Sequence, residues 1–161
     1  MDEADVKLLP PEKINKYIFI GHGRSATWRE LQNFVQNHLG LQWDEVNRVP
    51  VAGRCNIDRL REMLDAAAFA FLILTAEDEM ADGDLEARMN VVHEAGLFQG
   101  RLGFEKAIAL LEDGCNAFSN IDGLVQIRFP TSQLSSKFED VRRVLERGGL
   151  LPFNRAASSQ P

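Results

Sequence analysis

Hydrophobic positions along the chain form short continuous runs that alternate with stretches of helical spacing. Continuous apolar runs of this length are typical of parallel strands that are buried on both faces. We predict five strands from these runs, at 16–23, 43–49, 69–75, 106–112 and 123–129. Apolar residues that recur every three or four positions predict amphipathic helices. We predict four such helices, at 26–40, at 57–67, around Glu94 and at 136–149.

Strand and helix alternate along the whole pattern, which predicts an α/β fold with a mostly parallel sheet. A sheet of about five strands at this chain length favours the flavodoxin-like order 2-1-3-4-5, with helices on both faces. In such sheets the ligand site lies at the carboxyl ends of the strands. We therefore expect the loops that follow residues 20, 48, 74 and 111 to form the functional edge.

Composition adds limits on the class of protein. The 161 residues are 45% hydrophobic and carry a net charge of −6, which argues against a nucleic-acid-binding or anionic-membrane-binding protein.

We predict a flexible linker at 1–15, one domain at 16–150 and a flexible tail at 151–161. The start of the chain lacks signal-peptide features and no apolar run is long enough to span a bilayer. Cys55 and Cys115 are too few for a disulfide framework and lack metal-ligand spacing, so we expect a cytoplasmic protein without a metal site.

The loop after the first strand, "GHGRSA", fits the pattern G-x-G-x-x-A of dinucleotide-binding loops. The alternative is a plain structural turn, because glycine is common after a strand. Asp44 and Glu45 lie near the position of a ribose-binding acid, but about five strands and no substrate domain argue against a dehydrogenase. His22 and Arg24 indicate a loop that contacts a ligand with its side chains as well as its backbone.

The segment "GRCN" at 53–56 follows the second predicted strand. One interpretation is a turn followed by an N-cap at Asn56. In the other, Arg54 reaches an anionic group or a neighbouring subunit. The pattern leaves both open.

The helix around "NVVHEAGLF" carries a carboxylate beside its buried side. Its core stripe comprises Val91, Ala95, Phe98 and Leu102. Glu94 lies about 100° around the helix from Ala95, at the border of the stripe, and Asn90 lies one turn earlier on the same side. From the pattern alone, Glu94 is either a solvated edge residue or, with Asn90, a holder of a ribose diol.

With these segments in place, the sequence resembles a known family. "YIFIGHGRS", "GRCNIDRLREMLDAAAFAFLILTAEDE", "ARMNVVHEAGLFQGRLG" and "DGLVQIRF" occur in the order found in bacterial TIR-like domains. The resemblance is to the predicted nucleotide-binding TIR domains that act as effectors in cyclic-nucleotide-triggered phage defence. Its motifs are HGR, L-T-x-x-D and N-V-x-x-E-x-G-x-F, and it covers residues 17–150.

The resemblance implies a TIR fold and NAD+ glycohydrolase activity, with NAD+ as substrate and no bound cofactor. It implies that Glu94 is catalytic and that other residues contact the substrate: Gly23, Arg24, Ser25, Gly53, Arg54, Asp78 and Asn90. It also implies homo-oligomers joined by TIR–TIR contacts, in which the loop at 49–55 completes a neighbour's site. A cyclic-nucleotide-sensing domain or partner would provide the signal.

One carboxylate suffices for this chemistry, because the nicotinamide of NAD+ is cationic and leaves as a neutral group. Ordinary glycosidases need two carboxylates, since their leaving oxygen must be protonated. Two other functions stay open, a non-catalytic TIR adaptor and a Glu-dependent enzyme similar to nucleoside deoxyribosyltransferases. Linear and cyclic ADP-ribose are both possible products.

Overall fold

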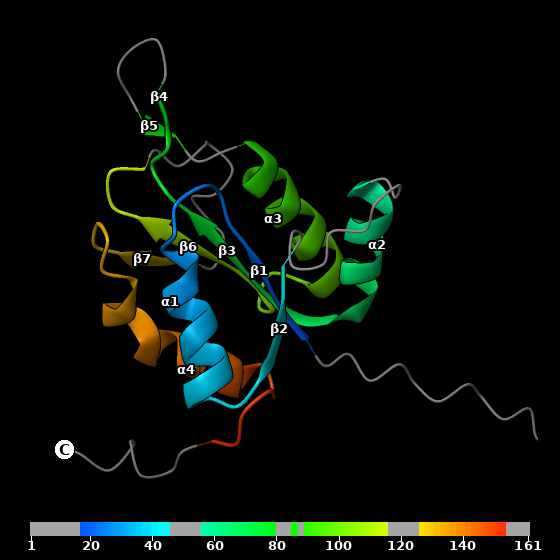
Figure 1. Ribbon diagram of the computed structural model, residues 1–161. Helices are drawn as coiled ribbons and strands as arrows, with labels where there is room; N and C mark the ends of the chain where they lie inside the picture. Colours follow the sequence, from blue (N-terminus) through cyan, green and yellow to red (C-terminus); the bar gives the residue numbers. More distant parts are fainter. Residues whose placement is uncertain (1–16, 46–55, 80–84, 87–88, 116–125, 154–161) are drawn as a thin grey trace, which may run out of the picture.

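The protein is built around a parallel sheet of five strands in the order β2-β1-β3-β6-β7 (Figure 1). The computed structural model describes residues 17–45, 56–79, 85–86, 89–115 and 126–153. The strands are β1 (Tyr17–Gly21), β2 (Gln42–Asp44), β3 (Ala67–Leu74), β6 (Ala107–Glu112) and β7 (Gln126–Phe129). All four pairings are parallel. The predicted fold class and strand order are therefore confirmed.

Helices cover both faces of the sheet. They are α1 (Trp28–Asn33) with the π-helical turn η1 (Phe34–His38), α2 (Asn56–Ala66), α3 (Met89–Leu102), the 3-10 turn η2 (Leu134–Lys137) and α4 (Phe138–Arg147). Side chains of α1, η1, η2 and α4 belong to one core cluster, and those of α2 and α3 to the other. Figure 1 shows α3 and α2 on the side of the sheet opposite to α1 and α4.

The central strand β3 explains why two cores form. Phe69, Phe71 and Ile73 pack against α1 and α4, whereas Leu72 and Leu74 face the α2–α3 layer. All five are at most 1% exposed. Because successive side chains of a strand point to opposite faces, an unbroken apolar run fills both layers. Each such side chain contributes about 1.5–3 kcal/mol through burial.

Small side chains allow α3 to lie close to the sheet. Ala70, Ala107 and Ala109 are fully buried in the core cluster that contains α3. The rings of Phe19 on β1 and Phe98 on α3 stack with centroids 4.0 Å apart. This packing fixes the position of α3 relative to the end of β1.

Two parts of the chain differ from the sequence prediction. The helix expected at 26–40 consists of α1 and η1, and Gly40 ends it with a φ of 66°, a conformation that glycine adopts without strain. The acidic stretch after β3 contains a short antiparallel pair, β4 (Asp78–Glu79) and β5 (Leu85–Glu86), where we expected only a loop. Strands of two residues leave no readable alternation in a sequence, so the pair could not be predicted.

Several predicted segments lie wholly or partly outside the described residues. They include the linker at 1–15, the end of the second predicted strand at 46–49, residues 53–55 of the segment at 53–56, the start of the fifth predicted strand at 123–125 and the tail from residue 154 onward. Within the described part of the chain, no helix has the length and apolarity needed to cross a membrane.

Candidate active site

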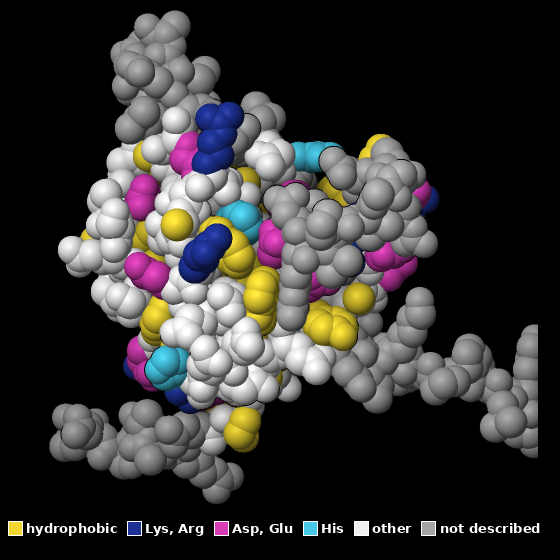
Figure 2. All heavy atoms as spheres, viewed as in Figure 1, with side chains coloured by type: hydrophobic (Ala, Val, Ile, Leu, Met, Phe, Trp, Pro, Cys, Tyr) yellow, Lys and Arg dark blue, Asp and Glu magenta, His cyan; other side chains and the backbone are white. Residues whose placement is uncertain are grey.

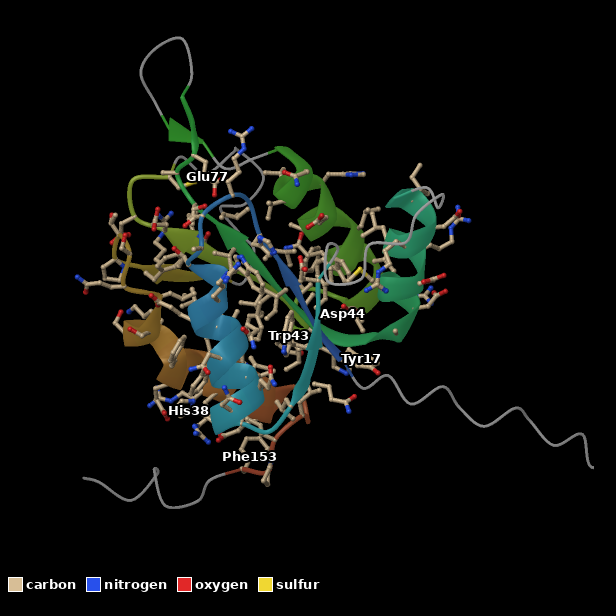
Figure 3. All side chains as sticks on the ribbon, in the orientation of Figure 1. Tyr17, His38, Trp43, Asp44, Glu77 and Phe153 are labelled. Carbon is tan, nitrogen blue, oxygen red and sulfur yellow. The ribbon has the colours of Figure 1, made fainter. Side chains whose placement is uncertain are left out.

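The carboxyl ends of β1 and β3 lie side by side and bring two loops together. Gly21 at the end of β1 pairs in register with Leu72 of β3. The loop at 22–25 therefore lies next to the residues that follow β3. Figure 3 shows Glu77 at this edge, close to the loop that follows β1. The predicted functional edge is the place where these segments meet.

Glu94 reaches this edge from α3. Val91, Ala95 and Phe98 are buried as predicted, so the helix is held with Glu94 at the side of its buried stripe. A Cβ atom built on Gly21 would lie only 2.9 Å from Oε2 of Glu94 and 2.5 Å from Cδ1 of Leu72. The carboxylate thus occupies space that only a glycine at the end of β1 leaves open.

The environment of Glu94 disfavours its charged form. Burial raises the pKa of the Glu94 carboxyl from its ordinary value of 4.5 to about 7, and the charge of Glu45 raises this pKa as well. None of the described residues donates a hydrogen bond to Glu94. A carboxylate that is partly desolvated and lacks donors is poised to interact with a cation or to exchange a proton near neutral pH.

Glu45 is buried directly after β2 and faces the first loop. Its Oε2 lies 3.0 Å from Nε2 of His22, whose Nδ1 donates to the carbonyl oxygen of Gly23 at 2.8 Å. The His22 ring stacks on Trp28 with a centroid distance of 4.3 Å. His22 is thereby fixed by three contacts and links the end of β2 to the first loop.

Asp44, the other acid considered for a ribose, has a structural partner. Its two carboxylate oxygens accept hydrogen bonds from Arg59 of α2 at 3.0 and 2.9 Å. This ion pair joins β2 to α2. Asp44 and Glu45 are neighbours in the sequence, but only Glu45 faces the first loop and acts on Glu94.

The predicted residues of the first loop are arranged around Glu77. The backbone N–H groups of Arg24 and Ser25 donate to Oε2 and Oε1 of Glu77, at 3.0 and 2.8 Å. The Ser25 hydroxyl is 2.8 Å from the hydroxyl of Thr27, and Arg24 is exposed. Gly23 lies directly against the Glu77 carboxylate.

The remaining predicted site residues are not joined to this group by the described contacts. Asn90 is exposed at the start of α3. Asp78 lies in β4, and the placement of its side chain is not described. Gly53 and Arg54 lie outside the described residues. The site as described therefore consists of Glu94, the first loop and the acids around them.

Sequence reasoning missed Glu77. It lies in an acidic stretch whose charges resemble those of any solvated loop. Its position offered one signal, because it follows Thr75, the first polar residue after the buried run of β3 and so a marker of the carboxyl edge. Within the described part of the chain, no three His, Cys, Asp or Glu side chains are grouped so as to hold a metal ion.

Comparison with known families identifies the family of α/β domains to which the chain belongs. Residues 17–131 match the family described as "CAP12/Pycsar effector protein, TIR domain". The chain belongs to this TIR-domain family. The match includes β1, the first loop, Glu77 and Glu94, and it confirms the resemblance seen in the sequence.

Two curated proteins are similar to this TIR domain. CD-NTase-associated protein 12 of Sphingobacterium faecium is 26% identical over 141 residues, which is 83% of this chain and 42% of that protein. The uncharacterized protein YuaY of Escherichia coli K12 is 25% identical over 118 residues, covering 70% of this chain and 39% of that protein. The chain thus spans about two fifths of the length of either relative.

Proposed function

We propose that this TIR domain is an NAD+ glycohydrolase that acts as an effector in cytoplasmic antiphage defence. The observation that carries the proposal is the carboxylate of Glu94, which lies against the end of β1 without a hydrogen-bond donor among the described residues. Membership of a family of effector TIR domains supports the defence role. The name of the Sphingobacterium relative associates that protein with a CD-NTase, which supports a cyclic-nucleotide signal for this chain.

The reaction breaks the bond between ribose C1′ and the nicotinamide nitrogen. The bonding electrons move to the nitrogen, so nicotinamide leaves neutral and positive charge develops on the ribose ring. Ionised Glu94 stabilises this charge, and Glu45 adds a second negative charge nearby. The oxygen of a water molecule then bonds to C1′ and releases one proton. The products are nicotinamide, ADP-ribose and H+; capture of C1′ by the adenine ring would give the cyclic form instead.

The other residues of the edge would bind and orient the dinucleotide. The exposed Arg24 would contact the diphosphate, and Ser25 the ribose next to nicotinamide. Asn90, Asp78, Gly53 and Arg54 keep the binding roles that the family resemblance implies, with Gly53 and Arg54 supplied to the site by a neighbouring copy in a homo-oligomer. A sensor domain or partner that binds a cyclic nucleotide would drive this assembly.

Charge supports a small anionic substrate over nucleic acid. On the face that Figure 2 draws, acidic and basic side chains of the described residues are interspersed and form no continuous basic stripe of the kind that nucleic-acid-binding surfaces carry. The net charge of −6 agrees with this distribution. We therefore propose neither a nucleic acid nor a membrane as partner.

The test is incubation of concentrated protein with NAD+ and separation of the products by chromatography. Wild type should release nicotinamide, and Glu94→Ala should reduce the rate by about 10²–10³-fold, as loss of one electrostatic catalytic group does. Glu112→Gln is the matched control, since Glu112 is also a buried carboxylate at this edge and its amide oxygen can still accept from Ser132 N. It should retain the wild-type rate.

The alternatives predict different products. A non-catalytic adaptor would assemble without ever releasing nicotinamide. A nucleoside deoxyribosyltransferase-like enzyme would release a free base from deoxynucleosides and leave NAD+ intact. Equal nicotinamide release by wild type and Glu94→Ala in an assembled sample would contradict the role of Glu94.

A further inference from the structure

The Glu77 carboxylate lies against the backbone of the first loop. Its Oε2 accepts the backbone N–H of Arg24 at 3.0 Å, and its Oε1 accepts that of Ser25 at 2.8 Å. Oε1 also accepts the hydroxyl of Thr75, the buried residue at the end of β3, at 2.6 Å. Three donors from two loops therefore converge on one carboxylate.

Gly23 shows how closely the loop fits this carboxylate. A Cβ built on Gly23 would lie 2.5 and 2.7 Å from the two oxygens of Glu77, and 2.8 Å from its carboxyl carbon. Any side chain at position 23 would push the carboxylate away. The second glycine of the G-x-G-x-x-A pattern thus allows close approach of an anion, as it does in dinucleotide-binding loops, but the anion here belongs to the protein.

Two successive backbone N–H groups directed at one anion form the type of nest that holds phosphate groups in other proteins. In this chain the two N–H groups already have charge-assisted hydrogen bonds, which are short and strong. A substrate diphosphate could use the same donors only by displacing Glu77. It would also meet repulsion from the negative charge of Glu77 as it approached.

We propose that Glu77 is the resident anion of the first loop: it positions the loop and directs the substrate diphosphate to the Arg24 side chain instead of the loop amides. This inference rests on the proposed function only in naming the substrate. Arg24 is exposed, and no described carboxylate forms an ion pair with its guanidinium group. His22, the other basic residue of the loop, is held by Glu45 and Trp28.

The test is a stability measurement that requires no catalysis. Thermal unfolding of wild type, Glu77→Ala and Glu112→Ala is recorded with increasing inorganic pyrophosphate, at an ionic strength kept constant with sodium chloride. Glu112→Ala is the matched control, because Glu112 is the last residue of strand β6 and accepts one loop N–H, that of Ser132 at 3.2 Å. A ligand that binds the folded state raises the unfolding temperature, and the rise grows with the logarithm of the ratio of ligand concentration to Kd once the ligand is in excess.

Glu77→Ala should have a lower unfolding temperature than wild type without pyrophosphate and recover most of it when pyrophosphate is added. The apparent affinity of this variant for pyrophosphate should exceed that of wild type and of Glu112→Ala by about tenfold or more, since two charge-assisted hydrogen bonds become available. Equal pyrophosphate responses in Glu77→Ala and either reference protein would overturn the proposal. A general loss of packing would lower the unfolding temperature but would not create a preference for pyrophosphate.

A second measurement covers the case in which Glu77→Ala does not fold. Pyrophosphate is titrated into wild type and Glu77→Gln while the backbone amide resonances of Arg24 and Ser25 are followed by NMR. These resonances should stay in place in wild type and shift in the variant, whose neutral amide holds the loop less strongly. Shifts of both amide resonances in wild type would show that pyrophosphate reaches these two N–H groups while Glu77 is present, and would overturn the proposal. Because neither readout uses NAD+, absence of NAD+ cleavage leaves the result interpretable.

Discussion

Two carboxylates at the same edge of the sheet illustrate how similar residues come to have different roles. Glu77 accepts hydrogen bonds from Arg24 N, Ser25 N and Thr75 Oγ1. Glu94 accepts none from the described residues, and its pKa is raised to about 7. A carboxylate with several donors is stabilised in its charged form and holds structure, whereas one without donors retains its capacity to interact with a substrate. The difference lies in the donors that each loop supplies.

The largest effect is expected from a change that displaces the Glu94 carboxylate. Gly21→Ala places a methyl group 2.9 Å from the Glu94 carboxylate and 2.5 Å from Leu72. A displacement of about 1 Å in a catalytic group costs on the order of 10²-fold in rate, and overpacking destabilises by about 1–3 kcal/mol. The NAD+ cleavage rate should show the loss of activity, and urea unfolding should show the loss of stability.

Gly96→Ala is the matched control on α3, two residues after Glu94. A Cβ there has no neighbour within 4 Å, so this helical Gly→Ala change should stabilise by about 0.5–1 kcal/mol and leave the rate unchanged. If Gly21→Ala retained the full rate at a protein concentration where wild type is active, the close approach of Glu94 to β1 would have no catalytic role.

A smaller effect concerns the stability of the folded protein and tests whether Glu94 differs from Glu77 in lacking partners. Folded Glu94 retains its proton up to about pH 7, whereas an unfolded carboxyl releases it near pH 4.5. The folded state binds more protons between these values, so wild type should lose stability as pH rises from 4.5 to 7 and remain at the lower level above. Glu94→Gln removes this loss and should be more stable than wild type by on the order of 2 kcal/mol at pH 8.

Urea unfolding of the two proteins at several pH values provides the measurement. The difference should shrink as the pH falls toward 4.5 and disappear at lower pH, where both side chains are neutral in the folded and in the unfolded state. A variant less stable than wild type at pH 8 would indicate that Glu94 is satisfied by partners, like Glu77, and would remove the distinction between the two carboxylates.

The smallest expected effect concerns the neighbour of Glu94. Glu45→Gln removes the negative charge that contributes to the raised pKa of Glu94 but keeps an oxygen that can contact His22. The midpoint of the pH–rate profile should move downward and stay above 4.5, because burial is the larger cause of the raised pKa. An unchanged midpoint would show that Glu45 does not act on Glu94.

Much of the fold followed from the sequence because its strands are strongly marked. The buried runs of β1, β3 and β6 have no polar interruptions, so the strand count, order and burial were predictable. The β4–β5 pair was not, since it has only two residues in each strand. The π-helical turn η1 was also missed, because a helix with an extra residue in its turn has nearly the same apolar spacing as an α-helix.

The site was predictable only in part. The period of α3 placed Glu94 at the border of a buried stripe, and the structure has it there. Asn90, expected on the same side, is exposed at the first turn of the helix. The two backbone N–H groups that bind Glu77, those of Arg24 and Ser25, are 53 and 52 residues away in the sequence, so its role depends on tertiary contacts that local pattern does not encode.

The central claim is that ionised Glu94 cleaves NAD+, and nicotinamide release measured from pH 5 to 9 tests it most directly. The sample is concentrated wild-type protein, with Glu94→Gln measured in parallel and both proteins shown to be folded at each pH. The rate for wild type should rise with pH, reach half its maximum near pH 7 and then level off, while the variant releases no nicotinamide above background. A wild-type rate that is independent of pH or falls as pH rises, or a variant that matches wild type, would contradict the account.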